Sequence, residues 1–236
     1  MSSEYMTVEC LDLAGKGLLS LPELQKYLSA AVEASAQDEN MDSLLHKCAR
    51  SGSLELCTEL LDNGARINDL DKRGMSALFS ATEYGRTDVV ELFIDRGASS
   101  KIMREDTGWS ILHMGAYNGH LETMTALLKK LPEADVAHFI NMGDKDQRTP
   151  LHIASFRSST EMVRLLMERG AKPALQDIRH NTPQELALKV GKEQTVELFE
   201  VAGTTPKAHA FTNPQRRASS RDIAAAAIQA ATAMAT

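Results

Sequence analysis

Three histidines occur in similar local sequences and are the first candidates for acid–base chemistry. His46, His113 and His152 each follow a leucine, and an imidazole can gain or lose a proton near neutral pH. Catalysis by such a base also needs a nucleophile and a residue that orients the base, and the sequence shows no such set. It also shows no phosphate-binding glycine loop, HExxH helix or GxSxG turn. We therefore predict that the protein is not an enzyme and uses no cofactor.

The cysteines do not form a recognisable redox or metal-binding pattern. Cys10, Cys48 and Cys57 are an odd number and contain no CxxC pair, which argues against a disulfide framework and a zinc site. We expect Cys48 and Cys57 to be small buried side chains. These features favour a reducing compartment, so we predict a cytoplasmic protein, with the nucleus or the cytoskeleton as further locations.

Residues 12–23 resemble the calcium-binding loop of an EF-hand. Asp12, Gly17 and Glu23 stand at the first, sixth and twelfth positions, but Ala14 and Lys16 occupy positions three and five. Calcium needs about six to eight oxygen ligands, and a lysine at a ligand position repels the ion. We interpret the segment as a degenerate EF-hand that keeps the helix-loop-helix shape, and we predict no metal site. A calcium response remains an alternative.

The overall charge limits the classes of partner. The formal net charge is −6, which does not indicate a nucleic-acid-binding surface. No run of residues approaches the roughly 18 apolar residues of a membrane span, and the sequence from Met1 to Glu4 lacks the features of a secretory signal. We expect a monomer that binds neither nucleic acid nor membrane.

A period close to 33 residues organises most of the chain. Five two-residue segments stand in register, at steps of 33, 34, 39 and 33 residues: Leu45-His46, Leu78-Phe79, Leu112-His113, Leu151-His152 and Gln184-Glu185. Each follows a serine or threonine suited to capping a helix and precedes a small residue. A glycine then ends the first apolar run in four of the five copies, before a second apolar run. The pattern predicts repeated helix pairs that must stack to bury their apolar faces.

The copies resemble ankyrin repeats. The best match is residues 144–154, which are close to the family pattern D-x-x-G-x-T-P-L-H-x-A with Gln147 in place of glycine. The resemblance covers about residues 41–202 and implies an all-α solenoid of five helix pairs joined by short β-hairpins or loops. It also implies that the repeated histidine hydrogen-bonds to backbone between repeats, a structural role instead of a catalytic one.

Several segments depart from the repeat pattern. The first copy has no recognisable hairpin before Met41, and the fifth is polar, as expected for a C-terminal capping repeat. The third copy carries six extra residues near Pro132, for which we predict an extra turn. We predict three parts: residues 1–40 as a helical N-terminal cap, residues 41–202 as the repeat domain, and residues 203–236 as a flexible, basic, alanine-rich tail. In the tail, Ser219 follows two arginines and is a possible phosphorylation site.

The family resemblance also implies where a partner binds. Ankyrin proteins present hairpin tips and the ends of the inner helices on a concave surface, and large aromatic residues and arginine are enriched in binding hot spots. For Trp109, the alternative is that the indole packs across its own hairpin. Mapped onto this chain, the predicted partner-binding residues are Lys72, Arg73, Met75, Tyr84, Trp109, Tyr117, Arg148, Phe156, Arg157 and Arg179.

We therefore predict a non-catalytic adaptor or scaffold that binds a protein partner on the concave repeat surface. One alternative is a regulatory module, an assembly chaperone or an inhibitor of a larger complex, which responds to calcium through the segment of residues 12–23. The other is an enzyme with an unfamiliar site, which a pocket of acids and bases with shifted pKa values would support.

Overall fold

The structure is a computed structural model that describes residues 3–157 and 159–202. The chain divides into two units, residues 1–205 and 206–236, and all described residues belong to the first. The described residues form helices and isolated bridges but no strand, which confirms the predicted all-α fold of stacked helix pairs. The helices are α1 (Ser3–Gly15), α2 (Leu21–Ser29), α3 (Leu44–Ser51), α4 (Leu54–Asp62), α5 (Ala77–Glu83), α6 (Thr87–Asp95), α7 (Ile111–Asn118), α8 (Leu121–Lys130), α9 (Glu133–Phe139), α10 (Pro150–Arg157), α11 (Thr160–Glu168), α12 (Pro183–Lys189) and α13 (Glu193–Val201).

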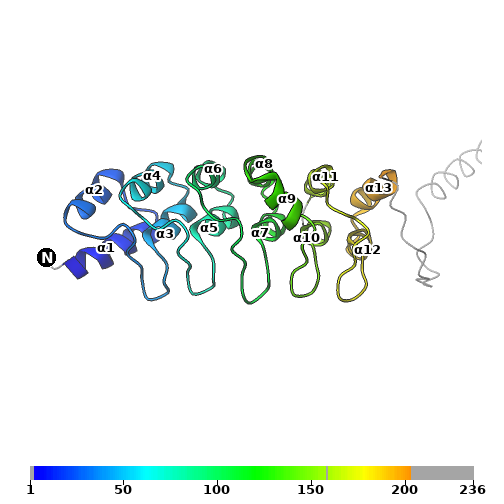
Figure 1. The fold of residues 1–236 in the computed structure, drawn as a ribbon, viewed down its shortest axis with the longest axis horizontal. Helices are drawn as coiled ribbons and strands as arrows, with labels where there is room; N and C mark the ends of the chain where they lie inside the picture. The colour runs from blue at the N-terminus through cyan, green and yellow to red at the C-terminus, as the bar shows by residue number, and fades with distance from the viewer. Residues whose placement is uncertain (1–2, 158, 203–236) are drawn as a thin grey trace, which may run out of the picture. The chain divides into compact units, whose positions relative to one another are not determined.

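Apart from α9, the helices of the first unit stand in two rows (Figure 1). The inner row contains α1, α3, α5, α7, α10 and α12, and each helix packs on the next. The outer row contains α2, α4, α6, α8, α11 and α13 in the same order. Long loops project from the inner row before α3, α5, α7, α10 and α12 (Figure 1). We call these loops hairpins, and we number the five repeats by the inner helices that follow them.

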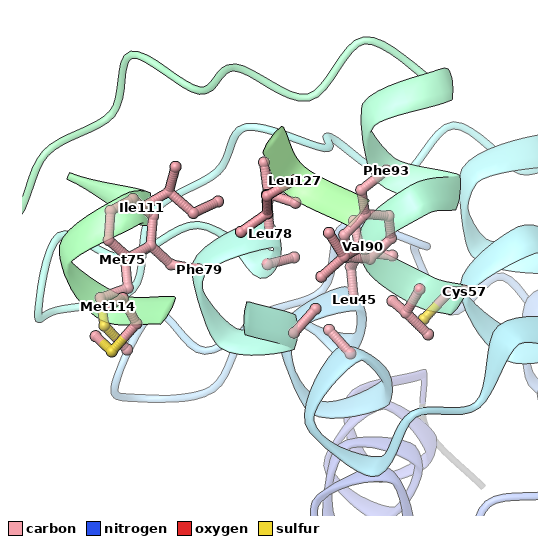
Figure 2. Packing of buried hydrophobic residues seen from close by; sticks show 14 of the residues in the cluster. Leu45, Cys57, Met75, Leu78, Phe79, Val90, Phe93, Ile111, Met114 and Leu127 are labelled. Atoms are coloured by element: carbon pink, nitrogen blue, oxygen red, sulfur yellow. The ribbon is translucent and has the colours of Figure 1, made fainter. Parts of the chain in front are cut away.

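One continuous apolar core joins the repeats. Leu45, Leu78 and Leu127 come from three successive repeats and belong to the same buried cluster (Figure 2). The cluster also includes Leu24 and Cys10 of the first two helices, which are fully buried. The pair α1–α2 therefore occupies the place of a further repeat and covers the apolar side of repeat one.

Side chains at the start of α3, α5, α10 and α12 accept hydrogen bonds from free N–H groups of these inner helices. The Ser76 hydroxyl accepts a hydrogen bond of 3.4 Å from the N–H of Phe79. In repeat five, the Thr182 hydroxyl accepts from Glu185, whose carboxylate accepts from the N–H of Thr182 at 2.7 Å. Glu185 thus completes a capping box at the position that histidine occupies in other repeats.

Three buried histidines link successive repeats. In each ring, Nδ1 accepts from the hydroxyl and the N–H of the capping residue, and Nε2 donates to a carbonyl of the next hairpin. The donor–acceptor distances from His46, His113 and His152 are 2.9, 2.9 and 3.0 Å, to Met75, Arg148 and Asn181. This confirms the predicted structural role. Burial lowers the pKa of all three rings, that of His113 to about 4, so the neutral form is favoured.

Each hairpin turns through one residue with a positive φ. In repeats two and three this residue is Gly74 or Gly108, but in repeats four and five it is Gln147 (φ 58°) and His180 (φ 60°). A side chain raises the energy of this left-handed conformation. Adjacent hairpins are also tied by backbone hydrogen bonds, such as that from Ile178 N–H to the Asp146 carbonyl at 2.9 Å.

The first repeat has a hairpin, and the expectation that it lacks one is wrong. The Asp38 carboxylate accepts hydrogen bonds from the N–H groups of Asn40 (2.8 Å) and Asp42 (3.0 Å), while Gln37 and Ser43 form a bridge. Asp71 closes the hairpin of repeat two in the same way. The missed signal was Asp38, which stands 33 residues before Asp71.

The extra residues of repeat three form a short helix, α9, where we predicted an extra turn. Pro132 stands directly before α9 and separates it from α8. Val136 and Phe139 are buried in the common core, and the Asp135 carboxylate accepts a hydrogen bond of 2.6 Å from Ser100. The insertion therefore contributes core packing.

Candidate functional site

A buried aspartate positions the side chains at the tip of the fourth hairpin. One carboxylate oxygen of Asp144 accepts from the N–H groups of Asp146 (2.9 Å) and Arg148 (2.8 Å). The other accepts from Arg148 Nε and from Trp109 Nε1, each at 3.0 Å. The side chain of Asp144 is fully buried. Asp144 therefore fixes both the indole of the preceding hairpin and the guanidinium of its own.

Asp177 closes the turn of the fifth hairpin through an equivalent pair of backbone hydrogen bonds. It accepts hydrogen bonds from the N–H groups of Arg179 (2.9 Å) and Asn181 (2.8 Å). Burial alone would raise the pKa of the Asp177 carboxyl, but these hydrogen bonds outweigh it and the pKa is lowered. The Asp177 carboxylate is thus occupied within its own turn.

Aromatic and cationic side chains stack beside this hairpin. The rings of Trp109 and Tyr117 lie 5.0 Å apart between centroids, at an angle of 52°. The guanidinium carbon of Arg157 lies over the Tyr117 ring, 4.3 Å from the ring centroid. A cation over the face of an aromatic ring is attracted by the negative charge of that face. Repeats three and four thus form one continuous aromatic–cationic surface.

These residues line a groove of about 410 Å³ that spans repeats three to five. We call it the aromatic groove, and its lining is Trp109, Tyr117, Asp146, Arg148, His152, Ile153, Phe156, Arg157, Asp177, Ile178, Arg179, Asn181, Leu186 and Lys189. Phe156 and Ile178 are 48% and 57% exposed, although both are apolar. The volume lies within the range of about 300–1,000 Å³ that is typical of ligand-binding clefts.

Six of the ten predicted partner-binding residues meet in the aromatic groove. They are Trp109, Tyr117, Arg148, Phe156, Arg157 and Arg179. Lys72, Arg73 and Tyr84 belong to repeat two and are not part of its lining. Tyr84 is 49% exposed, and the Arg73 guanidinium donates to the Asp71 carboxylate at 3.0 Å.

Met75, which was predicted to face a partner, is fully buried, so this prediction is wrong. Its N–H donates to the Asp71 carboxylate at 2.9 Å, and its side chain belongs to the same buried cluster as Phe79 and Ile111 (Figure 2). In repeat two, the residue directly before the capping serine therefore points into the core. Trp109 stands at the same place in repeat three but is larger and stays partly exposed.

Lys189 was missed, although the repeat pattern contains its signal. Tyr117, Phe156 and Lys189 stand in the same register, at steps of 39 and 33 residues, and Glu83 holds this position in repeat two. The position was singled out only where it holds an aromatic ring. In the structure, the Lys189 ammonium donates to the side-chain carbonyl of Asn181 and lines the groove.

The segment that resembles an EF-hand engages its main acidic groups elsewhere. Asp12 lies within α1 and forms an ion pair of 2.6 Å with Lys16. The Glu23 carboxylate accepts hydrogen bonds from the N–H (2.9 Å) and hydroxyl (2.6 Å) of Ser20, which caps α2. No group of at least three potential ligands among His, Cys, Asp and Glu gathers within residues 3–157 and 159–202.

The three cysteines are buried. Burial raises the pKa of all three cysteine thiols, those of Cys10 and Cys48 to about 12, which disfavours the reactive thiolate. No helix of the described chain has the length and hydropathy needed to cross a membrane. Ser219 and the predicted tail lie outside the described residues.

The comparisons with known proteins agree with this architecture. A family model described as ankyrin repeats (3 copies) matches residues 19–106, 45–139 and 100–177. E3 ubiquitin-protein ligase XBAT32 of Arabidopsis thaliana is 30% identical over 188 residues, which cover 70% of this chain and 35% of that protein. The nuclear factor NF-kappa-B p105 subunit of Gallus gallus is 30% identical over 130 residues, which cover 55% of this chain and 13% of that protein.

The chain spans only about a third or less of the length of the curated relatives it matches. Among solved structures, it is similar to a chain in the Bd0816 predatory endopeptidase of Bdellovibrio bacteriovorus in complex with immunity protein Bd3460. The TM-score is 0.70 at 21% identity, and the match covers 81% of this chain and 96% of that chain. This similarity shows a shared fold.

Proposed function

The chain belongs to the ankyrin repeat family, and we propose that it is a non-catalytic adaptor or scaffold. In this proposal, a protein partner binds the face made by the hairpin tips and the inner helices, with the aromatic groove as its centre. Ankyrin repeats are protein-interaction units, and the proposal assigns the surface on which this chain binds its partner.

The exposure of large apolar side chains at the aromatic groove carries the proposal. Stacking of repeats requires apolar residues in the core but not at the ends of the inner helices. Nevertheless Tyr117 and Phe156 are 38% and 48% exposed on α7 and α10, and Ile178 is exposed on the neighbouring hairpin. A clustered apolar surface with arginines beside it is typical of a binding hot spot.

The interior polar contacts make this surface rigid before any partner binds. The indole of Trp109 is held by Asp144, and the Tyr117 ring contacts both that indole and the Arg157 guanidinium. A preformed surface loses little conformational freedom on binding, which favours affinity. Asp144 and His113, which hold the two hairpins, act on the partner only by positioning these side chains.

Affinity capture with the full chain tests the proposal. Tyr117→Ala combined with Phe156→Ala removes two exposed rings, so we expect retained folding and loss of captured proteins. The matched control, Leu54→Ala with Leu121→Ala, removes two side chains of the outer row that are 42% and 37% exposed. Capture that survives the first pair, or is lost only with the second, overturns the proposed surface.

A regulatory module, an assembly chaperone or an inhibitor would use the same surface on a different partner. Adding the purified chain to the captured partner distinguishes these roles, since an inhibitor lowers the partner's activity and an assembly chaperone changes its assembly state. Calorimetry with calcium tests the calcium-responsive variant. The engagement of Asp12 and Glu23 with Lys16 and Ser20 leads us to expect no heat of binding.

A further inference from the structure

The aromatic groove has a local charge opposite to that of the whole chain. Its lining contains four cationic side chains, Arg148, Arg157, Arg179 and Lys189, and two carboxylates, Asp146 and Asp177, which gives a net charge of +2. The burial-lowered pKa of His152 favours its neutral form. The chain as a whole carries −6. A cationic cleft on an anionic protein concentrates field of one sign at that cleft.

The two carboxylates of the lining are already engaged. The Asp177 carboxylate accepts hydrogen bonds from three groups of its own turn: the backbone N–H groups of Arg179 and Asn181 and the side-chain amide of Asn181. Asp146 forms an ion pair of 3.1 Å with Arg148. Neither carboxylate neutralises the remaining cations of the groove.

Three of the cations keep their charge available. Arg157, Arg179 and Lys189 are exposed, and none forms an ion pair within residues 3–157 and 159–202. Arg157 contacts the face of the Tyr117 ring. Arg179 donates to Asp177 through its backbone N–H, and Lys189 donates to the neutral side-chain amide of Asn181. These groups are therefore placed to receive carboxylates from outside.

Apolar and cationic groups alternate within the same groove. Phe156 directly precedes Arg157 at the end of α10, and Ile178 directly precedes Arg179 at the tip of the fifth hairpin. A ligand that fills the groove must therefore bring an apolar side chain and negative charge within a few residues of each other. Alternation of this kind excludes a purely apolar helix as the best occupant, because the cations would be desolvated without partners.

We propose that the aromatic groove binds an acidic peptide segment with an aromatic or aliphatic anchor, supplied by the protein partner. The anchor packs against Tyr117, Phe156 and Ile178, and flanking carboxylates pair with Arg157, Arg179 and Lys189. This inference rests on the proposed function and specifies the partner's chemistry. The chain's own residues 206–236 fit less well, since Lys207, Arg216, Arg217 and Arg221 against Asp222 give them +3.

An unbiased selection tests the chemistry of the ligand. A displayed library of random peptides is selected on the full chain, with counter-selection on the variant Arg157→Gln/Arg179→Gln/Lys189→Gln. We expect recovered peptides to contain glutamate or aspartate around a phenylalanine, leucine or similar residue. Recovery of neutral or basic peptides, or of no peptide, overturns the proposal.

The fluorescence of Trp109 measures binding directly, because it is the only tryptophan and lines the groove. The probe is a short synthetic peptide with a central phenylalanine flanked by glutamates, and its matched control replaces the glutamates by glutamines. Losing three exposed ion pairs should weaken binding roughly tenfold, both for the control peptide and for the triple variant. The variant Lys129→Gln/Arg164→Gln removes exposed cations of the outer row and should bind normally. Equal affinity of both peptides overturns the proposal.

A charge-reversal variant distinguishes the loss of ion pairs from damage to the fold. The variant Arg157→Glu/Arg179→Glu should lose the glutamate peptide but gain a peptide in which lysines replace the glutamates. Binding of neither peptide by a variant that melts like the parent contradicts direct pairing. Competition by single-stranded RNA, or dimers that dissociate in the triple variant, would instead assign the groove to RNA or to a second copy of the chain.

The two proposals can fail separately. Capture of a partner that depends on Tyr117 and Phe156, but is unchanged in the triple variant, would keep the adaptor function and reject the acidic ligand. If the partner is still captured by both sets of variants, both proposals are rejected.

Discussion

The indole Nε1 of Trp109 donates a hydrogen bond of 3.0 Å to the buried carboxylate of Asp144, so the third hairpin is tied to the fourth. Trp109 is therefore both a wall of the aromatic groove and part of its support. Because Asp144 belongs to the next hairpin, Trp109 does not pack only across its own hairpin.

Trp109→Phe tests how much the indole hydrogen bond contributes to the stability of the fold. The substitution keeps an aromatic ring but removes one donor to Asp144, so we expect the free energy of unfolding to fall by about 1 kcal/mol. Denaturant unfolding followed by circular dichroism measures the change. Tyr84→Asn, at an exposed ring of repeat two, is the control; an equal loss in both variants would contradict a specific role for the indole.

Leu151→Ala should be among the more damaging changes. Leu151 is fully buried in α10, and loss of its side chain leaves a cavity that costs about 2–5 kcal/mol. The exposed Ile178→Ala should change stability by less than about 0.5 kcal/mol. Chemical denaturation of both variants checks the register of the repeats, and a neutral Leu151→Ala would contradict it.

Gln147→Gly should stabilise the protein. Gln147 has φ 58° and an exposed side chain, so glycine relieves backbone strain without removing packing. We expect a net gain of about 0.5–1 kcal/mol, because the greater freedom of glycine in the unfolded chain offsets part of the relief. Thermal melting against Gln147→Ala, which keeps the strain, measures the gain. No difference between glycine and alanine would show that the left-handed turn is unstrained.

Stability should decrease on acidification through the titration of the buried histidines. Burial lowers the pKa of His113 to about 4 in the folded protein, whereas the unfolded value is about 6.5. The unfolded chain thus binds more protons between these values, so the contribution is complete above about pH 6.5 and is lost toward pH 4. It amounts to roughly 3 kcal/mol for His113.

Unfolding free energies measured at several pH values give this slope. His113→Asn should lower stability at pH 7 and flatten the slope between about pH 6.5 and 4. His180→Asn, which removes an exposed histidine, controls for loss of an imidazole. An unchanged slope in His113→Asn would show that other groups govern acid unfolding.

The fold was accessible from the sequence because the repeat restates the same signals five times. Capping residues, apolar pairs and terminating glycines agree with one another, so errors at one copy do not shift the register. The role of His46, His113 and His152 followed from their equivalent positions. The hairpin before Met41 was missed because its turn uses methionine where the family pattern has glycine, and only Asp38 marked it.

The candidate site was less accessible, because exposure depends on neighbours that no local pattern specifies. Met75 and Trp109 hold the same position, yet the methionine fits inside the core and the larger indole extends to the groove. Lys189 is not aromatic and was identified only from the structure, in which it lines the groove together with Arg179. The pairing of Arg157 with Tyr117 joins two repeats and likewise required coordinates.

The fifth repeat supplies Ile178, Arg179 and Lys189 to the groove, yet α12–α13 is the last described helix pair and has only one neighbouring pair among the described helices. In a one-dimensional array, a pair with a single neighbour unfolds locally more often than an interior pair. Fraying of α12–α13 would dismantle one wall of the groove, so occupancy and local melting are thermodynamically linked. We therefore expect a bound ligand to stabilise this end of the array, so that the amide hydrogens of α12 exchange more slowly when the ligand is present.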